Sequence, residues 1–252
     1  MNTLDELKKI LGPSAKEHVL LGPLTTFKVG GPADLYFEAR TADQLETAVK
    51  EARRLEVPLF VLGGGTNILI ADAGIRGLVI RNLTTNVAIR GMKGEQRGTQ
   101  KSGTVYVEAD SGVFINKLVR FTVEEGLAGL EMQLGLPGSV GGAIYMNSKW
   151  THPEGYVGDC VYQAKLVMAS GEVVIKPKSY FRFAYDSSTI QTTGDVVISV
   201  IFALVTESKE RLWQVANESI AYRRLTQPQG VFSAGCTFRN LSQAEVLSVP
   251  TP

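Results

Sequence analysis

Residues 57–67 read VPLFVLGGGTN, an apolar run that ends in three successive glycines. The apolar run predicts a buried strand, and the glycines predict a turn whose backbone can adopt positive φ. Inward-pointing N–H groups in such a turn can bind a phosphate or a pyrophosphate. The stretch matches neither the G-x-x-x-x-G-K-[ST] nor the G-x-G-x-x-G pattern, so a plain turn between two strands is the alternative interpretation.

The segment before this turn completes a β-α-β unit. Residues 35–39, LYFEA, alternate in polarity as a strand does. Residues 41–57 carry apolar side chains at helical spacing, with acidic residues early, two arginines late and Thr41 as a possible cap. The residues after the turn, ILIADAG (68–74), are strand-like.

A second glycine cluster, GLPGSVGGAIYMN, covers residues 135–147. Gly141 and Gly142 remove side chains where a flat ring or a diphosphate could lie, and Ser139 can donate a hydrogen bond. A tight loop packed under a sheet is the alternative. Two Gly-rich turns in a β-α-β setting favour a dinucleotide cofactor.

Strands and helices alternate along the rest of the chain. The polar, Gly-rich residues 91–103 predict a mobile hairpin loop. No internal repeat interrupts this order, which predicts an α+β fold. The other predicted elements are strands at 77–83, 104–113 and 196–205, a hairpin at 164–175 that turns at Ser170–Gly171, a helix at 114–131 that ends near Gly126, and a helix at 207–227.

The composition is that of an ordinary globular protein. The chain has 252 residues, of which 44% are hydrophobic and 20% charged, and its formal net charge is +1. Nothing in this balance indicates a nucleic acid or an anionic membrane as a partner. The longest apolar run, VVISVIFALV, has about half of the ~20 residues that a bilayer-spanning helix needs.

The chain has two cysteines, Cys160 and Cys236, and two histidines, His18 and His152. Because they form no close cluster, neither a metal site nor a disulfide framework is predicted. Together with a start that lacks the apolar stretch of a signal peptide, this indicates the cytoplasm. A monomer is the expectation for the oligomeric state.

Four stretches together resemble the UDP-N-acetylenolpyruvoylglucosamine reductase family: PLTTFKVGGPA, LGGGTNILI, GLPGSVGGA and Met146–Asn147, which occur in the family's order over about residues 20–240. The resemblance implies an α+β, vanillyl-alcohol-oxidase (PCMH)-type FAD-binding fold of two subdomains that hold FAD between them. A substrate-binding domain follows them in the family. The corresponding division is 1–82, 83–205 and 206–252, the last being a truncated start of the third domain.

The resemblance also implies which residues bind FAD. They lie in the two glycine clusters, after the 104–113 strand and at the end of the second cluster. The predicted cofactor residues are Leu62, Gly63, Gly64, Gly65, Thr66, Asn67, Gly112, Pro137, Gly138, Ser139, Val140, Gly141, Gly142, Ala143 and Asn147.

In the family, NADPH reduces FAD, and the hydride then passes to the enolpyruvyl double bond of UDP-N-acetylglucosamine enolpyruvate. The resulting enolate takes a proton from a serine or cysteine in S-A-G-[SC], which is Ser233 to Cys236 here. A thiol with a pKa of ~8.5 is protonated at neutral pH and is far more acidic than a hydroxyl. Cys236 is therefore the predicted proton donor, and a small buried hydrophobe is the alternative.

The chain departs from the family at the arginine of F-x-Y-R-x-S, which stabilises the enolate. Here Asp186 follows Tyr185 in that motif. A carboxylate would repel the developing negative charge. Either Asp186 points away while Arg182 or another cation takes the role, or the reaction is slower, or it has been lost. Tyr185 and Arg182 are accordingly the other predicted catalytic residues.

The residues around the last predicted helix resemble the family's sugar-nucleotide contacts. Arginine can pair with a diphosphate in bidentate fashion, although cations also suit a solvated helix end. The chain ends sixteen residues after Cys236, before the family's catalytic glutamate, and Glu245 is too early for that role, so part of the third domain is expected to be absent. The predicted substrate residues are Tyr222, Arg223, Arg224, Gln227 and Ser233.

Two rival functions stay open. One is an FAD-binding paralogue with impaired or lost catalysis, which Asp186 and the chain end favour. The other is a different flavin oxidoreductase on the same fold, such as an alcohol or sugar oxidase. Such oxidases often attach flavin through His or Cys, and neither glycine cluster contains one.

Overall fold

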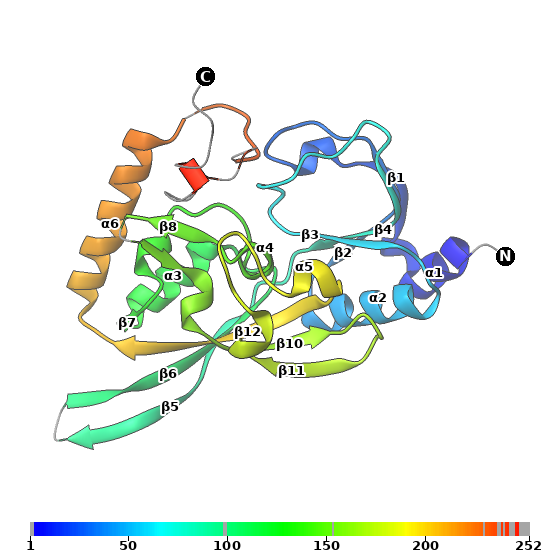
Figure 1. The fold of residues 1–252 in the computed structure, drawn as a ribbon. Coiled ribbons are helices and arrows are strands. Elements are labelled where there is room, and N and C mark those ends of the chain that lie inside the picture. The colour runs from blue at the N-terminus through cyan, green and yellow to red at the C-terminus, as the bar shows by residue number, and fades with distance from the viewer. Residues whose placement is uncertain are drawn as a thin grey trace.

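Two β-sheets with a helix packed between them form the body of the molecule (Figure 1). The computed structural model describes residues 3–97, 100–152, 154–228, 230–235, 238, 240, 241, 245 and 246. Helix α2 (Ala42–Arg54) joins the sheets, because its buried apolar face contacts Leu78 and Ile80 of the first and Val196 and Ile198 of the second.

The first sheet has the strand order β1-β2-β4-β3. Strands β2 and β3 flank β4 and run parallel to it, as the connection through α2 requires, whereas β1 pairs with β2 in the antiparallel sense. Helix α1 packs Leu7 into the core beside this sheet. The elements are α1 (Thr3–Leu11), β1 (Lys16–Leu20), β2 (Pro32–Ala39), β3 (Leu59–Leu62) and β4 (Ile75–Asn82), with short 3-10 turns at Gly12–Ser14 and Gly22–Leu24.

The second sheet is antiparallel, with the order β11-β10-β12-β6-β5. Its core is built from β6, β12, α3, α4 and α6. The strands are β5 (Val87–Arg97), β6 (Gln100–Asp110), β7 (Leu127–Ala128), which pairs with β12, β10 (Val161–Val167), β11 (Val173–Pro177) and β12 (Val196–Thr206), and the short pair β8 (Lys149–Thr151) and β9 (Glu154–Tyr156) lies apart. The helices are α3 (Ile115–Glu124), α4 (Val140–Met146), α5 (Ile190–Thr193) and α6 (Lys209–Thr226), with 3-10 turns at Glu131–Gln133, Val157–Cys160 and Lys178–Phe181.

Most of the predicted elements are confirmed. The helix predicted at 41–57 is α2, and the Thr41 side chain caps it by accepting a hydrogen bond from the Gln44 N–H. The helix predicted at 114–131 is α3, which ends just before Gly126. The hairpin predicted at 164–175 is β10–β11, and Gly171 in its turn has φ +87°.

Two predictions differ from the structure. The hairpin predicted at 91–103 is present but has longer strands than expected, because β5 and β6 continue pairing through Gly94 and Gly103, and it projects from the body (Figure 1). Residues 91–94 are exposed, and exposed strand residues need no apolar alternation, so their polar sequence predicts a loop. Residues 68–74 are not a strand: the Ala71 carbonyl accepts from Gly31 and Gly74 in a turn.

The predicted division into three parts stays a prediction. Its first boundary lies in the connection between β4 and β5, which joins the two sheets. Its second boundary precedes α6, yet Leu212 and Ala216 of α6 pack into the core of the second sheet. Among the described residues, no helix combines the length and the apolar character that crossing a bilayer requires.

Candidate functional site

The two glycine clusters lie in direct backbone contact. The first follows β3, and the second leads into α4. A Cβ on Gly64 would lie 2.9 Å from the Gly138 Cα and 3.3 Å from Cε1 of Phe114. No side chain fits at Gly64 without moving the second turn, so the glycine allows two segments far apart in sequence to meet.

The second turn is held from below by the start of α3. The Gly138 carbonyl accepts from the Ile115 N–H at 3.0 Å, and the Ser111 carbonyl accepts from the Gly141 N–H at 2.7 Å. Ser139 caps α4 by accepting a weak hydrogen bond from the Gly142 N–H at 3.4 Å. The turn therefore has a fixed position relative to the second sheet.

A buried polar network connects this turn to the end of β4. The Asn82 side chain donates to the Ser111 hydroxyl at 2.8 Å and accepts from the Thr84 hydroxyl at 2.9 Å. The Gly112 N–H in turn donates to Thr84 Oγ1 at 3.0 Å. Because all four residues are buried, these bonds fix the two sheets against each other behind the glycine contact.

A third segment reaches the first glycine turn from beyond α6. Thr26 binds the Gly65 carbonyl through its N–H at 2.9 Å, and its hydroxyl donates to the Ser233 carbonyl at 2.7 Å. A Cβ on Gly235 would lie 3.2 Å from Asn67 Oδ1. Residues 233–235 therefore lie beside the first turn. Cys236 follows them in the sequence but lies outside the described residues, so its role stays a prediction.

The predicted cofactor residues differ in whether they are accessible. Three of them are exposed, namely Asn67, Pro137 and Gly142. Seven are buried: Leu62, Gly65, Gly112, Ser139, Val140, Ala143 and Asn147. Gly142 has open space above its Cα, since the nearest atom to an added Cβ would be Ser139 Oγ at 3.7 Å. The exposed positions, with the half-exposed Phe114 ring, form the accessible edge of the two turns.

The predicted catalytic residues Tyr185 and Arg182 lie at the other end of α4. Asn147 ends this helix with φ +46°, and its side chain donates to the Ala184 carbonyl at 2.9 Å and accepts from the Gly158 N–H. Tyr185 lies in the tight turn that follows and is 37% exposed. Arg182 is exposed with φ +43° and makes no hydrogen bond or ion pair with the described residues.

The predicted substrate residues differ in their exposure. Arg223 is only 7% exposed, and its guanidinium carbon lies 3.6 Å from the centre of the Trp150 ring. Nε and Nη2 have no partner among the described residues, and burial lowers the pKa of Arg223 to about 10. Tyr222 stacks on His152 at 4.5 Å, whereas Arg224, Gln227 and Ser233 are exposed.

Two residues of the site escape the sequence analysis. Thr26 is missed because its two partners, Gly65 and Ser233, are 39 and 207 residues away. Phe114 is missed because it reads as the first apolar residue of a helix, although half of it remains exposed. The one available signal was the position of Thr26 in the PLTTFKVGGPA stretch.

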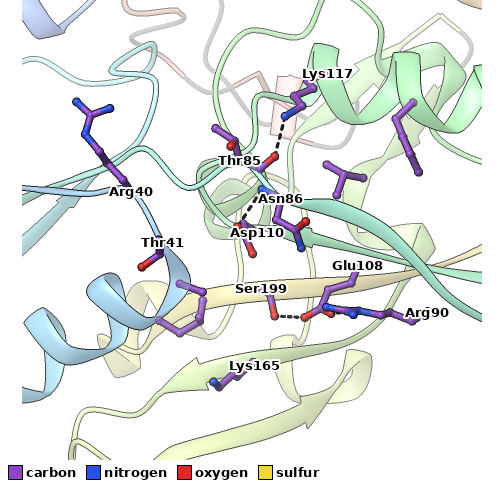
Figure 2. A pocket seen from close by; sticks show the side chains of 14 residues that line it. Arg40, Thr41, Thr85, Asn86, Arg90, Glu108, Asp110, Lys117, Lys165 and Ser199 are labelled. Atoms are coloured by element: carbon purple, nitrogen blue, oxygen red, sulfur yellow. Dashed lines mark hydrogen bonds and ion pairs between the residues drawn. The ribbon is translucent and has the colours of Figure 1, made fainter.

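A separate cavity of about 650 Å³ lies between the start of α2 and the second sheet (Figure 2). Asp110, whose pKa burial raises, accepts from the Asn86 N–H, and Ser199 donates to Glu108. The cations at its rim are engaged too: Arg90 pairs with Glu108, and Lys117 donates to a backbone carbonyl. None of the predicted site residues lines this cavity. The described residues contain no His, Cys, Asp and Glu cluster able to hold a metal.

Comparison with known proteins agrees with the geometry. Residues 33–175 match the FAD binding domain family. The UDP-N-acetylenolpyruvoylglucosamine reductase of Desulfosudis oleivorans is 35% identical over 222 residues, or 86% of this chain and 68% of that protein. The crystal structure of the reductase (MurB) from Thermus caldophilus has a TM-score of 0.71 and 29% identity, covering 92% of this chain and 78% of that one.

A more distant structure supports the fold alone. p-Cresol methylhydroxylase is 15% identical, with a TM-score of 0.51 over 81% of this chain and 43% of that one. The predicted α+β FAD-binding fold of the PCMH type is thereby confirmed.

Proposed function

The chain belongs to the UDP-N-acetylenolpyruvoylglucosamine reductase family, and we propose that it reduces UDP-N-acetylglucosamine enolpyruvate to UDP-N-acetylmuramate with NADPH. Family and fold make it an FAD-dependent oxidoreductase. The proposed reaction belongs to peptidoglycan precursor synthesis, which we propose takes place in the cytoplasm.

The observation that carries the proposal is the meeting of three segments at the first glycine turn. The second glycine turn touches Gly64, and residues 233–235 reach Asn67 and Thr26. This meeting supports a nucleotide cofactor at the turns, and in the sequence the proposed proton donor, Cys236, comes directly after Gly235.

The residues at the turns fit FAD. Asn67 and the open surface above Gly142 offer polar and backbone contact to a pyrophosphate, and the exposed Phe114 ring offers apolar contact to a flat ring. Bound FAD would carry the hydride from NADPH to the sugar. Among the predicted catalytic residues, Cys236 would hold the proton that the substrate enolate takes.

The predicted substrate residues are proposed to act from α6. Arg224 and Gln227 are exposed at its C-terminal end and can reach a diphosphate in solution-facing positions. Arg223 differs, because it is buried against Trp150. Its proposed role is to orient this end of the helix.

Two half-reactions test the proposal. The purified protein should be yellow, NADPH should bleach the flavin absorbance, and the enolpyruvyl sugar should restore it. A protein that cannot be reconstituted with FAD would refute the proposal. Bleaching without sugar-dependent recovery would instead favour the impaired paralogue that Asp186 suggests.

The proton donor is tested with its matched control. Cys236→Ala should leave bleaching by NADPH intact and abolish formation of UDP-N-acetylmuramate, because the enolate finds no donor. Cys160→Ala should retain product formation, because Cys160 donates to the Gly129 carbonyl in the core of the second subdomain. Parental turnover by Cys236→Ala would remove the proposed role.

A further inference from the structure

Asp186 stands where the resemblance implies an anion-binding arginine, so the proposed reaction requires another cation in this part of the site. Asp186 lies in the turn from Ala184 to Ser187. This turn is fixed to the end of α4, because the Asn147 side chain donates to the Ala184 carbonyl and Ser188 donates to the Tyr145 carbonyl at 2.7 Å. Helix α4 is about 10 Å long at 1.5 Å per residue. Its start touches the first glycine turn, and its end carries the Tyr185–Asp186 turn.

Among the residues that the structure describes, the cation in contact with this turn is Lys149 of β8, which follows α4. The Lys149 ammonium lies 5.5 Å from the centre of the Tyr185 ring and 5.5 Å from that of Tyr156, within the ~6 Å range of a cation–π contact. Its side chain is 21% exposed. The backbone anchors it, because Ser148 donates to the Ala143 carbonyl and accepts from the Val157 N–H.

The charge of Lys149 is available to a ligand. Its carboxylate partner is Glu154 at 3.1 Å, whose side chain is 64% exposed. Because water screens the exposed Glu154 carboxylate, the pair contributes little to stability, and a ligand carboxylate can compete for the ammonium. The hydrogen bond that Lys149 donates to Glu154 also raises the pKa of the ammonium, which stays charged. Arg182, by contrast, is exposed and has no contact that directs it to Tyr185.

We propose that Lys149 supplies the positive charge that the family's arginine supplies elsewhere, and that it binds the carboxylate of the enolpyruvyl group beside Tyr185. The inference rests on the proposed function. It makes Asp186 compatible with activity, because the enolate would form next to an ammonium held by two aromatic rings. Lysine acts as a point charge and does not use arginine's two-pronged geometry. Because Lys149→Arg keeps the positive charge, it should retain most of the function.

The test compares two ligands on the FAD-loaded protein. UDP-N-acetylglucosamine enolpyruvate carries the carboxylate, and UDP-N-acetylglucosamine lacks it. In Lys149→Met, calorimetry should show the Kd of the first ligand raised about 10-fold or more and that of the second unchanged. Flavin recovery by the enolpyruvyl sugar should slow about 100-fold, the effect of losing one charge-stabilising group, while bleaching by NADPH persists.

Lys176→Met is the matched control, because Lys176 lies 5.1 Å from the Tyr180 ring, outside the site, and should behave like the parent protein. Two results would overturn this inference alone. One is an equal loss of affinity for both ligands in Lys149→Met. The other is parental affinity in Lys149→Met together with a loss of affinity in Arg182→Met. A parent protein that binds neither sugar would overturn the proposed function, and this inference with it.

Discussion

Gly142→Ala separates what the second glycine turn does for the fold from what it does for a cofactor. Without cofactor, the added methyl group meets nothing closer than Ser139 Oγ at 3.7 Å, and Gly142 has no positive φ. Replacing glycine by alanine at a compatible position stabilises a protein by about 0.4–1 kcal/mol, chiefly by restricting the unfolded chain. For a chain of this size, the Tm of the FAD-free protein should rise by about 1–4 °C.

When FAD is present, the expected effect of Gly142→Ala becomes unfavourable. If Gly142 faces FAD, as predicted, the methyl group occupies space that the nucleotide needs. Overpacking of a close contact costs about 1–3 kcal/mol, which weakens the Kd for FAD by about 5- to 150-fold. One substitution should therefore make the empty protein more stable and the loaded protein weaker.

The assay is a pair of measurements on deflavinated protein: thermal unfolding without ligand and a fluorescence titration with FAD. Gly91→Ala is the matched control, because an added Cβ there meets no atom within 4 Å and Gly91 lies on β5, away from the turns. It should leave FAD affinity unchanged. A stabilised Gly142→Ala variant with parental FAD affinity would refute the assignment of Gly142 to the cofactor surface.

Three further predictions concern the framework. Thr26→Val removes a hydroxyl whose single proton is donated to the Ser233 carbonyl at 2.7 Å, with the Gly65 carbonyl more distant at 3.2 Å. The loss is about 1 kcal/mol, so proteolytic cleavage near residue 233 should become faster at unchanged Tm of the core. Arg223→Met replaces a buried guanidinium that has no counter-charge among the described residues, so urea unfolding should show equal or higher stability; a loss above about 2 kcal/mol would contradict this reasoning. Burial raises the pKa of Cys160 from 9.0 to about 11, so the folded thiol stays protonated where the unfolded one ionises. Stability should fall by up to about 2 kcal/mol from pH 9 to pH 11, and Cys160→Ser should show a flatter profile.

Local patterns were sufficient for the elements that carry the site. The apolar run before Gly63–Gly65 predicts a strand, which is β3. The apolar stripe of residues 41–57 predicts a helix with one face in a core, which is α2. The strand pairing within 91–103 was missed for the converse reason: residues 91–94 are exposed, and exposed strand residues carry no apolar period. A strand was wrongly predicted at residues 68–74, because the apolar Ile70 is buried in a turn and not in a strand.

Contacts between distant segments lay beyond such patterns. The approach of Gly64 to Gly138 depends on how α3 and α4 pack under the second sheet, which no stretch of sequence specifies by itself. Lys149 is the clearest case, because a lysine in a polar stretch predicts only a solvated surface. Its proposed role depends on its contact with Tyr185, and the hydrogen bond from Asn147 to the Ala184 carbonyl holds the Tyr185 turn beside it.

The contact between the two glycine turns also changes how the predicted cofactor residues act. At Gly64 and Gly138 the backbones touch, so no nucleotide passes between the turns at that point. Seven of the predicted residues are buried and can act only by holding the turns in place. In the proposed site, binding then depends on the exposed Asn67, Pro137 and Gly142 and on the half-buried residues of the two turns. Substitutions within the contact should therefore cost fold stability and cofactor together, whereas those on the edge should cost cofactor alone. That separation distinguishes a turn built for a ligand from one built for packing.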